Sequence, residues 1–246
     1  MATASRQRST KEVDYPSGDG KPMAETDVHR KDMVDVIQML DDHYATQPNV
    51  YVSGNLLMFY VEGDRRKHVS PDVFVVRGVA KKDRDHYLVW KEGRAPDLVV
   101  EITSKSTRRE DRGKKRELYR DVLKVTEFFQ FDPTEDYLKP PLQGSRLIEG
   151  EYVPIEPVNG RLPSDVLALH FERDGNRLRL FDPATGALLL TRAERADAER
   201  KQAEAERKRA EAERERAEAA DSARRELAEE NDQLRRELEA FRRTMT

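Results

Sequence analysis

The sequence predicts a mixed α and β domain followed by a long charged helix, and three observations carry this prediction. Short runs of apolar and β-branched residues, bounded by Pro, Gly or Asp, recur between positions 50 and 190 and indicate strands. A segment with helical periodicity precedes them, and a second helix is expected between two of the strands. From Thr191 to Arg243 the chain has no Gly or Pro and is rich in Ala, Glu, Arg and Leu, which favours one long solvent-facing helix.

The composition agrees with a single domain that carries appendages. Only 37% of the 246 residues are hydrophobic, and 38% are charged, against about 25% in typical domains. We therefore divide the chain into a disordered polar tail at residues 1–24, a domain at residues 25–190 and a charged helix or coiled coil at residues 191–246.

The cellular setting is predicted from what the sequence lacks. It has no cysteine, and residues 1–20 lack the apolar stretch of a secretory signal, so we expect a reducing cytoplasm. No apolar run approaches the roughly 18 residues that span a bilayer, so no membrane insertion is expected. The net charge of −3 excludes a globally basic nucleic-acid binder, and any DNA contact must come from a local patch.

The expected elements follow in order along the chain. Apolar residues at helical spacing predict a helix at Val28–Leu40, with Thr26 or Asp27 as its cap. Val50–Val61, interrupted by Ser53-Gly54-Asn55, predicts one kinked strand or a tight pair. Further strands are expected at Pro71–Val76, Pro96–Thr103 and Val125–Phe131. A polar connection is expected at Arg77–Trp90 and a helix at Arg108–Val122. Hairpins within Tyr137–Leu190, such as Arg146–Ile148 with Tyr152–Ile155, are expected to extend the sheet.

The order of these elements predicts part of the sheet topology. Pro96–Thr103 is continuously apolar apart from its acids, which is typical of a central strand buried on both faces. Strand, helix and strand in succession imply a crossover and at least one parallel pair, formed by Pro96–Thr103 and Val125–Phe131.

Two acids stand where the pattern calls for core residues. Asp72 opens one apolar strand and Glu101 closes another. If the strands are neighbours, the two carboxylates converge, and carboxylates on rigid strands can hold the Mg²⁺ that phosphodiester hydrolysis uses to neutralise phosphate charge and to activate water. The histidines His29, His43, His68, His86 and His170 have no ligand spacing, and we assign none of them to the site.

A lysine near the acids would orient the attacking water or stabilise the transition state. Asp111, Lys115 and Tyr119 lie at i, i+4 and i+8 of the expected helix and project from one face. Lys105 has the same strand parity as Glu101 and is the rival candidate.

Three segments in this order resemble a known family: "SPDVFVV", "APDLVVEITSKSTRREDRGKKRELY" and "EFFQFDP". They are similar to the Uma-two family of restriction endonucleases, a branch of the PD-(D/E)XK superfamily, over roughly residues 28 to 190. The resemblance implies a restriction-endonuclease-like core, a mixed β-sheet flanked by helices, and a DNA endonuclease that uses Mg²⁺ or Mn²⁺. It also implies that Asp72 and Glu101 bind the metal and that Lys115 is the catalytic lysine.

The chain departs from the family pattern at several positions. Thr103 stands where the superfamily usually has its lysine, and Lys105 stands where the family usually has proline, so the choice between Lys105 and Lys115 stays open. Asp97 shares strand parity with Glu101 but lies some 13 Å away along an extended strand at ~3.3 Å per residue, and its contribution also stays open. Lys124 replaces a glycine, and Phe128-Phe129 replaces a Tyr-Trp pair.

Two other functions compete with catalysis. The domain could be an inactive nuclease fold that binds nucleic acid or regulates a partner, because a fold does not fix a function. Alternatively, the helix could make the protein a coiled-coil scaffold. Retention of Asp72, Glu101 and a candidate lysine favours the enzyme.

The long helix contains a heptad repeat. Asn231 falls at position a between Leu227 and Leu234 at position d, and a buried Asn there favours two strands in register. We expect a parallel homodimer, against the alternative of a single solvated helix. The a positions are Ala203, Ala210, Ala217, Arg224, Asn231, Leu238 and Met245, and the apolar d positions are Ala220, Leu227, Leu234 and Phe241.

Overall fold

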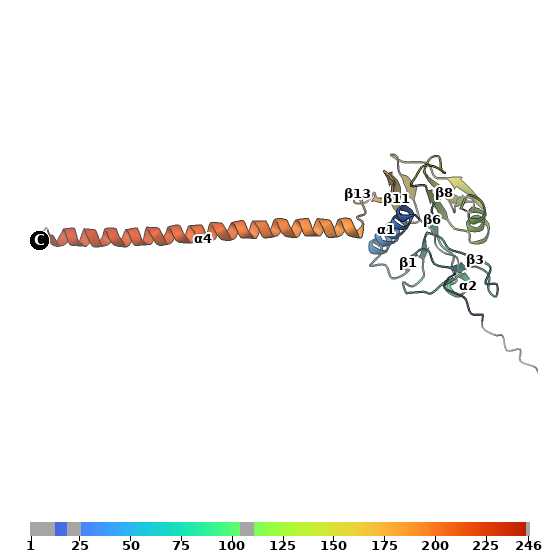
Figure 1. Cartoon of the computed structure of the whole chain (residues 1–246), viewed down its shortest axis with the longest axis horizontal. Helices are drawn as coiled ribbons and strands as arrows, with labels where there is room; N and C mark the ends of the chain where they lie inside the picture. The colour runs from blue at the N-terminus through green and yellow to red at the C-terminus, as the bar shows by residue number, and fades with distance from the viewer. Residues whose placement is uncertain (1–12, 19–25, 104–110, 245–246) are drawn as a thin grey trace, which may run out of the picture. The chain divides into compact units, whose positions relative to one another are not determined.

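The computed structural model describes residues 13–18, 26–103 and 111–244, and the chain divides into two units, Met1–Arg192 and Ala193–Thr246 (Figure 1). The first unit contains all the strands and the predicted site residues. The described residues of the second unit are part of a single helix.

A six-stranded mixed sheet forms the centre of the first unit. The strands run in the order β1-β4-β6-β7-β8-β9, and β6 and β7 pair in parallel while the other neighbours are antiparallel. All five residues of β6 are buried. The predicted central strand and its parallel partner are therefore confirmed. The bounds are β1 Val50–Ser53, β4 Val73–Arg77, β6 Leu98–Ile102, β7 Glu127–Phe131, β8 Leu142–Ile148 and β9 Glu151–Pro154.

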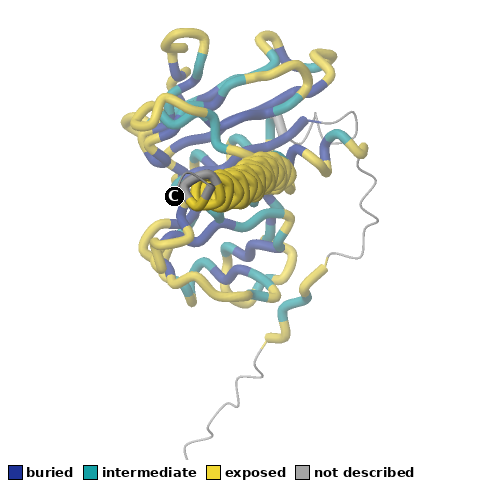
Figure 2. The backbone as a smooth tube through the Cα atoms, turned by 90° about the vertical axis from the view of Figure 1, so that its left-hand side faces the viewer, coloured by how far each residue is buried: buried dark blue, intermediate teal, exposed yellow. Residues whose placement is uncertain are grey.

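Both faces of this sheet are covered because its central strands are apolar on both sides. One face packs against α1 (Asp27–His43) and a four-stranded sheet, with Val36 and Phe171 among the residues that are fully buried there. The other face packs against a three-stranded sheet and the helical segment around Tyr119. Figure 2 shows the strands as the buried part of the unit and the turns as its exposed part.

Helix α1 confirms the helix expected at Val28–Leu40. The Thr26 side chain caps it by accepting a hydrogen bond from the His29 backbone N–H at 3.2 Å. This cap fixes the first turn, so His29 and the rest of the N-terminal end of α1 keep one orientation.

Residues 50–61 form neither one kinked strand nor a tight pair. β1 belongs to the six-stranded sheet, whereas β2 (Met58–Phe59) belongs to a separate sheet. Between them, a Cβ on Gly54 would lie 2.0 Å from the Asp72 carbonyl oxygen. The Asn55 N–H then donates to the Pro71 carbonyl at 2.8 Å, so the backbone leaves the ladder at this point.

The predicted polar connection at Arg77–Trp90 contains β5 (Tyr87–Leu88) and the first two residues of α2 (Val89–Glu92). The prediction for the hairpins needs correction. The hairpins after Tyr137 extend the central sheet only as far as β9, and the later strands form a sheet of their own on the α1 face. The three-stranded sheet consists of β3 (His68–Val69), β2 and β5 (Tyr87–Leu88), and the four-stranded sheet of β10 (Leu162–Ser164), β11 (Leu169–Asp174), β12 (Arg177–Asp182) and β13 (Ala187–Leu188).

The helix expected at Arg108–Val122 is described from Asp111 onward and is largely π-helical. Its segments are η1 (Asp111–Lys115) and η2 (Leu118–Val122), and the Leu123 N–H donates to the Leu118 carbonyl five residues earlier at 3.0 Å. π-helical turns are rare and occur frequently at functional sites.

Tyr15, within the predicted disordered tail, contacts the domain. Its ring packs on Phe59 and Trp90 with centroid distances of 5.0 and 5.3 Å, and its hydroxyl accepts a hydrogen bond from the Gly63 N–H at 2.7 Å. A single aromatic residue thus ties Val13–Gly18 to the domain.

The predicted long helix is present as α4 (Arg192–Thr244), which has 53 residues. At 1.5 Å per residue it is about 80 Å long. Every α4 residue from Ala193 onward whose burial is described is intermediate or exposed, as Figure 2 shows.

One buried acid joins the two large sheets of the domain. Glu127, at the start of β7, is fully buried and accepts hydrogen bonds from the Arg146 guanidinium at 2.9 and 3.0 Å. The Ser164 hydroxyl and the Asp165 N–H, at and after the end of β10, donate to the same carboxylate at 2.5 and 2.9 Å. Removing this carboxylate would leave the Ser164 hydroxyl and the Asp165 N–H without this acceptor, and would leave the Arg146 guanidinium with its ion pair to the exposed Asp165 carboxylate.

We predict that Glu127→Ala lowers the free energy of unfolding by about 3–5 kcal/mol, the range for removing one partner of a buried ion pair. Glu151→Ala is the matched control, because Glu151, at the start of β9 in the same sheet, also pairs with an arginine, Arg120 of η2, but is exposed, and its loss should cost about 1 kcal/mol or less. Urea unfolding measures both. Equal effects of the two substitutions would contradict this role of Glu127.

Candidate active site

The sheet register brings Asp72 and Glu101 together. β4 and β6 are antiparallel neighbours with Val73 opposite Val100, so the residue before β4 lies beside the penultimate residue of β6. The Ile102 N–H donates to Asp72 Oδ2 at 2.7 Å, which joins the two strand ends directly. The two acids predicted from the sequence therefore converge at one edge.

Glu101 is fully buried on the sheet face that packs against the π-helical segment. Lys115 Nζ donates to its Oε2 at 2.8 Å, and the Tyr119 hydroxyl donates to its Oε1 at 2.5 Å. A buried carboxylate costs several kcal/mol unless it is paired and hydrogen-bonded. Lys115 and Tyr119 meet both needs.

The helical segment explains how two residues reach one carboxylate. Lys115 ends η1 and Tyr119 lies in η2, and the two are four residues apart on one face. Lys115 Nζ also donates to the Ser70 carbonyl at 3.4 Å, just before Asp72. The lysine thus stands between the two acids, as the spacing of Lys115 and Tyr119 predicted, while the Asp111 side chain lies outside the described residues.

Asp72 is anchored by two hydrogen bonds to Oδ2, from the Ile102 N–H and from His29 Nε2 at 3.0 Å. Burial raises the pKa of this carboxyl, but the His29 hydrogen bond and the nearby charge of Lys115 outweigh burial and hold the pKa below its usual range. Asp72 is therefore a carboxylate at neutral pH.

Sequence reasoning missed His29. It lies 43 residues before Asp72 and is only 1% exposed, and no second histidine or acid at ligand spacing points to it. The one available signal was a polar residue in the first turn of an amphipathic helix, on the side that faces the core. Of the five histidines that the sequence left out of the site, His29 thus contacts a predicted metal ligand.

Two buried polar atoms flank Glu101 without a hydrogen-bond partner among the described residues. Thr103 follows the end of β6, two residues after Glu101, and Gln130 is on β7 directly opposite Glu101. Native proteins leave few buried polar groups unsatisfied. These two atoms can bind a water, an ion or a substrate oxygen beside the carboxylate.

Asp97 does not join this group of side chains. Asp97 sits at the opposite end of β6, where its Oδ2 accepts from the Arg77 N–H at 2.6 Å and its Oδ1 lies 3.6 Å from Arg94. Its contacts are those of a strand-end cap. Lys105 lies outside the described residues.

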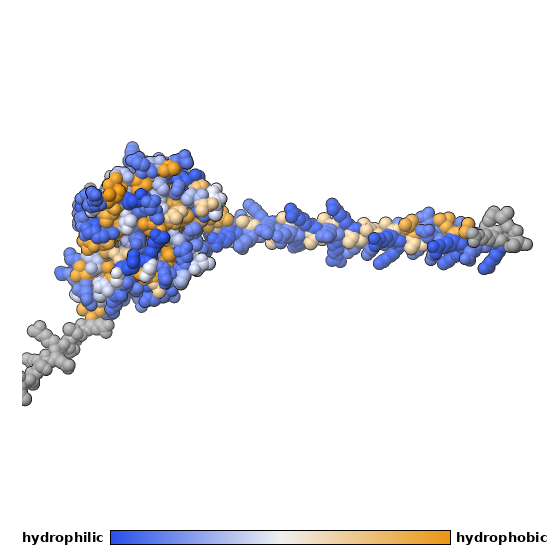
Figure 3. Space-filling view, turned by 180° about the vertical axis from the view of Figure 1, so that it is seen from behind, coloured by the Kyte–Doolittle hydropathy of each residue, from blue (hydrophilic) through white to orange (hydrophobic). Residues whose placement is uncertain are grey.

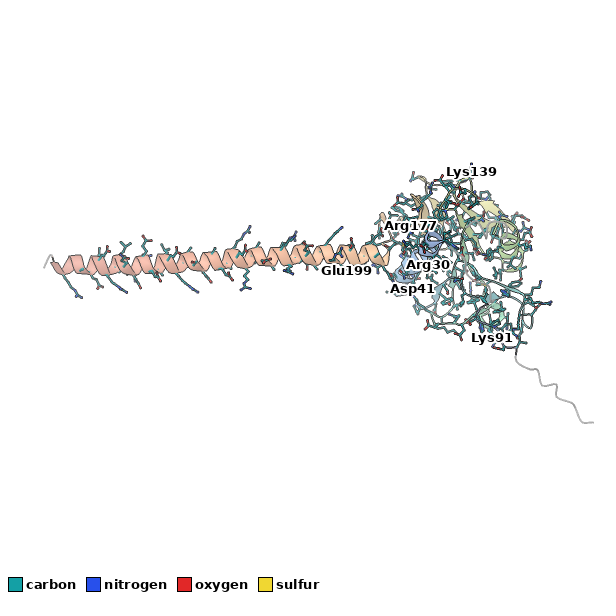
Figure 4. The ribbon with its side chains drawn as sticks, in the orientation of Figure 1. Arg30, Asp41, Lys91, Lys139, Arg177 and Glu199 are labelled. Atoms are coloured by element: carbon teal, nitrogen blue, oxygen red, sulfur yellow. The ribbon has the colours of Figure 1, made fainter. Side chains whose placement is uncertain are left out.

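Another buried acid, Asp32, lies one helical turn from His29. Asp32 is fully buried on α1, and Arg177 of β12 forms an ion pair with it at 3.0 Å and with Asp35 as well; Figure 4 shows Arg177 beside α1. Burial raises the pKa of Asp32 to about 6, although the charge of Arg177 and the nearby backbone of Leu178 oppose the rise.

The fold and these side chains define a class: a mixed sheet whose neighbouring strands present two acids beside a helical lysine, the restriction-endonuclease-like core that the sequence predicts. The Uma2 family, described as "Putative restriction endonuclease", matches residues 4–180, more than half of the chain, and the chain belongs to this family.

Other comparisons add little detail. A solved structure titled "putative nuclease belonging to DUF820", from Anabaena variabilis, is similar with 18% identity and a TM-score of 0.43, covering 60% of this chain and 77% of that chain. None of the curated proteins matches the chain. In the part of the chain that the structure describes, no helix is both long and apolar enough to cross a membrane.

We predict that Asp32 makes stability depend on pH. Because its folded pKa is raised, its contribution is fully present below the unfolded pKa of about 3.9 and is lost as pH rises through about 6. The unfolding free energy of the wild type minus that of Asp32→Asn should therefore fall by about 2–3 kcal/mol between pH 4 and pH 8. Urea unfolding at several pH values measures this difference, and a constant difference would contradict the prediction.

Proposed function

We propose that the domain is a metal-dependent DNA endonuclease that hydrolyses phosphodiester bonds. One observation carries the proposal: Lys115 Nζ lies 2.8 Å from the fully buried Glu101 carboxylate, beside Asp72 at the paired strand ends. Apolar residues of similar size would cost less to bury than these charges. Charged groups kept in such a place favour a catalytic role.

The acids fit a hard divalent cation. Both hydrogen bonds to Asp72 from described residues end on Oδ2, so Oδ1 can serve as a ligand. With His29 neutral, Asp72, Glu101 and Lys115 sum to one negative charge, which a cation would offset. Within the described residues no group of three or more acids and histidines forms a complete cage. Mg²⁺ commonly uses one or two carboxylates together with waters and substrate phosphate.

The proposed chemistry divides between the cation and the protein. When held by Asp72 and Glu101, Mg²⁺ or Mn²⁺ supplies Lewis-acid polarisation of a phosphate oxygen and lowers the pKa of a bound water. His29, the Ile102 N–H and Tyr119 keep the two carboxylates in place. Lys115 provides a positive charge that can stabilise the transition state or orient the attacking water.

The unsatisfied atoms next to Glu101 suit the substrate. Gln130 Nε2 is a donor and Thr103 Oγ1 is both a donor and an acceptor, and phosphate oxygens accept hydrogen bonds from either. A restriction endonuclease acts on DNA, so the family description favours DNA over RNA. The cytoplasmic location expected from the cysteine-free sequence stays a prediction.

We predict that Asp72→Asn and Glu101→Gln each abolish cleavage of supercoiled plasmid in Mg²⁺ or Mn²⁺, because each removes a metal ligand while keeping side-chain volume. The wild type with EDTA is the negative control. Asp97→Asn, at the other end of β6, is the matched variant and should cleave like the wild type. Normal cleavage by Asp72→Asn and Glu101→Gln would overturn the site.

The same assay separates catalysis from binding. A wild type that shifts DNA in gel electrophoresis but never cuts it with either metal would support the alternative of an inactive nucleic-acid-binding fold. Cleavage of RNA alone would change the substrate class and leave the site intact.

We predict that Lys115→Ala lowers turnover by about 10²–10⁴-fold, the usual effect of losing one acid–base or electrostatic group. Lys114→Ala is the control, because it removes an exposed lysine from the same segment. Lys105→Ala should have a milder effect than Lys115→Ala. The reverse ranking, measured under single-turnover conditions, would assign catalysis to Lys105.

A further inference from the structure

The C-terminal part of α4 carries an exposed apolar stripe. Leu227, Leu234 and Leu238 are 59%, 56% and 54% exposed, and they recur at spacings of seven and four residues. Figure 3 shows apolar residues gathering in this part of the helix, whereas the rest is mainly hydrophilic. Leucines at this spacing on a soluble helix indicate a partner helix.

The charges beside the stripe are complementary to a second copy. With Leu234 at position d, Glu230 and Glu237 occupy position g, while Arg235 and Asp221 occupy position e. In a parallel coiled coil, each g residue faces the e residue five positions later in the other chain. Glu230 then faces Arg235, and Arg216 at g faces Asp221.

An antiparallel pair would reverse this complementarity. Position g would face g and e would face e, so in the alignment that packs Asn231 against Leu234 of the other chain, Glu230 would face Glu237 and Arg235 would lose its acidic partner. The charges therefore select the parallel arrangement. The pairs Glu230–Arg235 and Arg216–Asp221 cannot form within one helix, because their members are five residues apart. Side chains interact along a helix at i+3 and i+4 and not at i+5.

The position of Asn231 in the heptad agrees with a two-stranded coiled coil whose chains are in register. Its Nδ2 donates to the Leu227 carbonyl of its own helix at 2.9 Å, and its position a lies in the middle of the stripe. A single polar Asn at this position specifies register and favours a dimer over larger bundles. The residue belongs to the same seam as the leucines.

We propose that α4 binds a second copy of this chain in a parallel, in-register two-stranded coiled coil, from about Ala217 to the end of the helix. Glu230–Arg235 and Arg216–Asp221 set its direction, and the leucines provide its core. Upstream, the seam is Ala, Glu and Arg, which bury little apolar surface. The short apolar seam gives a dissociation constant on the order of micromolar.

Sedimentation equilibrium of the full chain tests the association. We expect a monomer–dimer equilibrium, which Leu234→Asp abolishes and Gln233→Asp, the same replacement one residue away at position c, leaves in place. A chain that stays monomeric at about 100 µM, well above a micromolar dissociation constant, would overturn the proposal. A dimer unaffected by Leu234→Asp, or a trimer or tetramer, would overturn it as well.

Charge exchange tests the direction. Glu230→Arg alone places arginine opposite Arg235 twice in the dimer and should weaken it about tenfold, and Arg235→Glu alone should do the same. The double variant restores opposite charges and should return to within about threefold of the wild type. A double variant no tighter than either single variant would exclude parallel pairing in this register.

Discussion

The candidate site depends on the burial of one negative charge. Glu101 is fully buried within an apolar sheet face, and a carboxylate there is tolerated only with a counter-charge and hydrogen bonds. Lys115 and Tyr119 provide both, which couples the π-helical segment to β6. Asp72 then joins the same assembly through the Ile102 backbone and His29. The packing that stabilises this charge also holds the groups that would carry out hydrolysis.

Much of the fold follows from local sequence patterns. The continuous apolar run of β6, the helical periodicity of α1 and the absence of Gly and Pro in α4 are signals that few other structures produce, and each element was predicted with the correct type. The two acids were found because each interrupts an apolar strand, and the register that brings them together follows from the neighbouring strands. The predictions failed where strands have two residues, as in β2 and β5, because such short segments carry no periodicity.

The rest of the site could not be predicted because it rests on contacts between distant segments. Nothing near His29 distinguishes it from an ordinary buried histidine, and its role appears only when α1 lies against the end of β4. The π-helical turn is equally hidden, since its residues Leu118–Val122 would also suit an α-helix. The role of Glu127 was also not predictable from nearby residues, because its carboxylate accepts a hydrogen bond from Ser164, 37 positions later.

The close approach at Gly54 restricts how this chain can diverge. A methyl group there would lie 2.0 Å from the Asp72 carbonyl oxygen and 2.6 Å from Ile37 Cδ1, and the first contact is with main chain that cannot rotate away. Every substitution therefore displaces a proposed metal ligand as well as a core contact. Random mutagenesis should recover glycine alone at position 54. This one residue is thus a marker by which relatives that kept the acid geometry can be sorted from those that lost it.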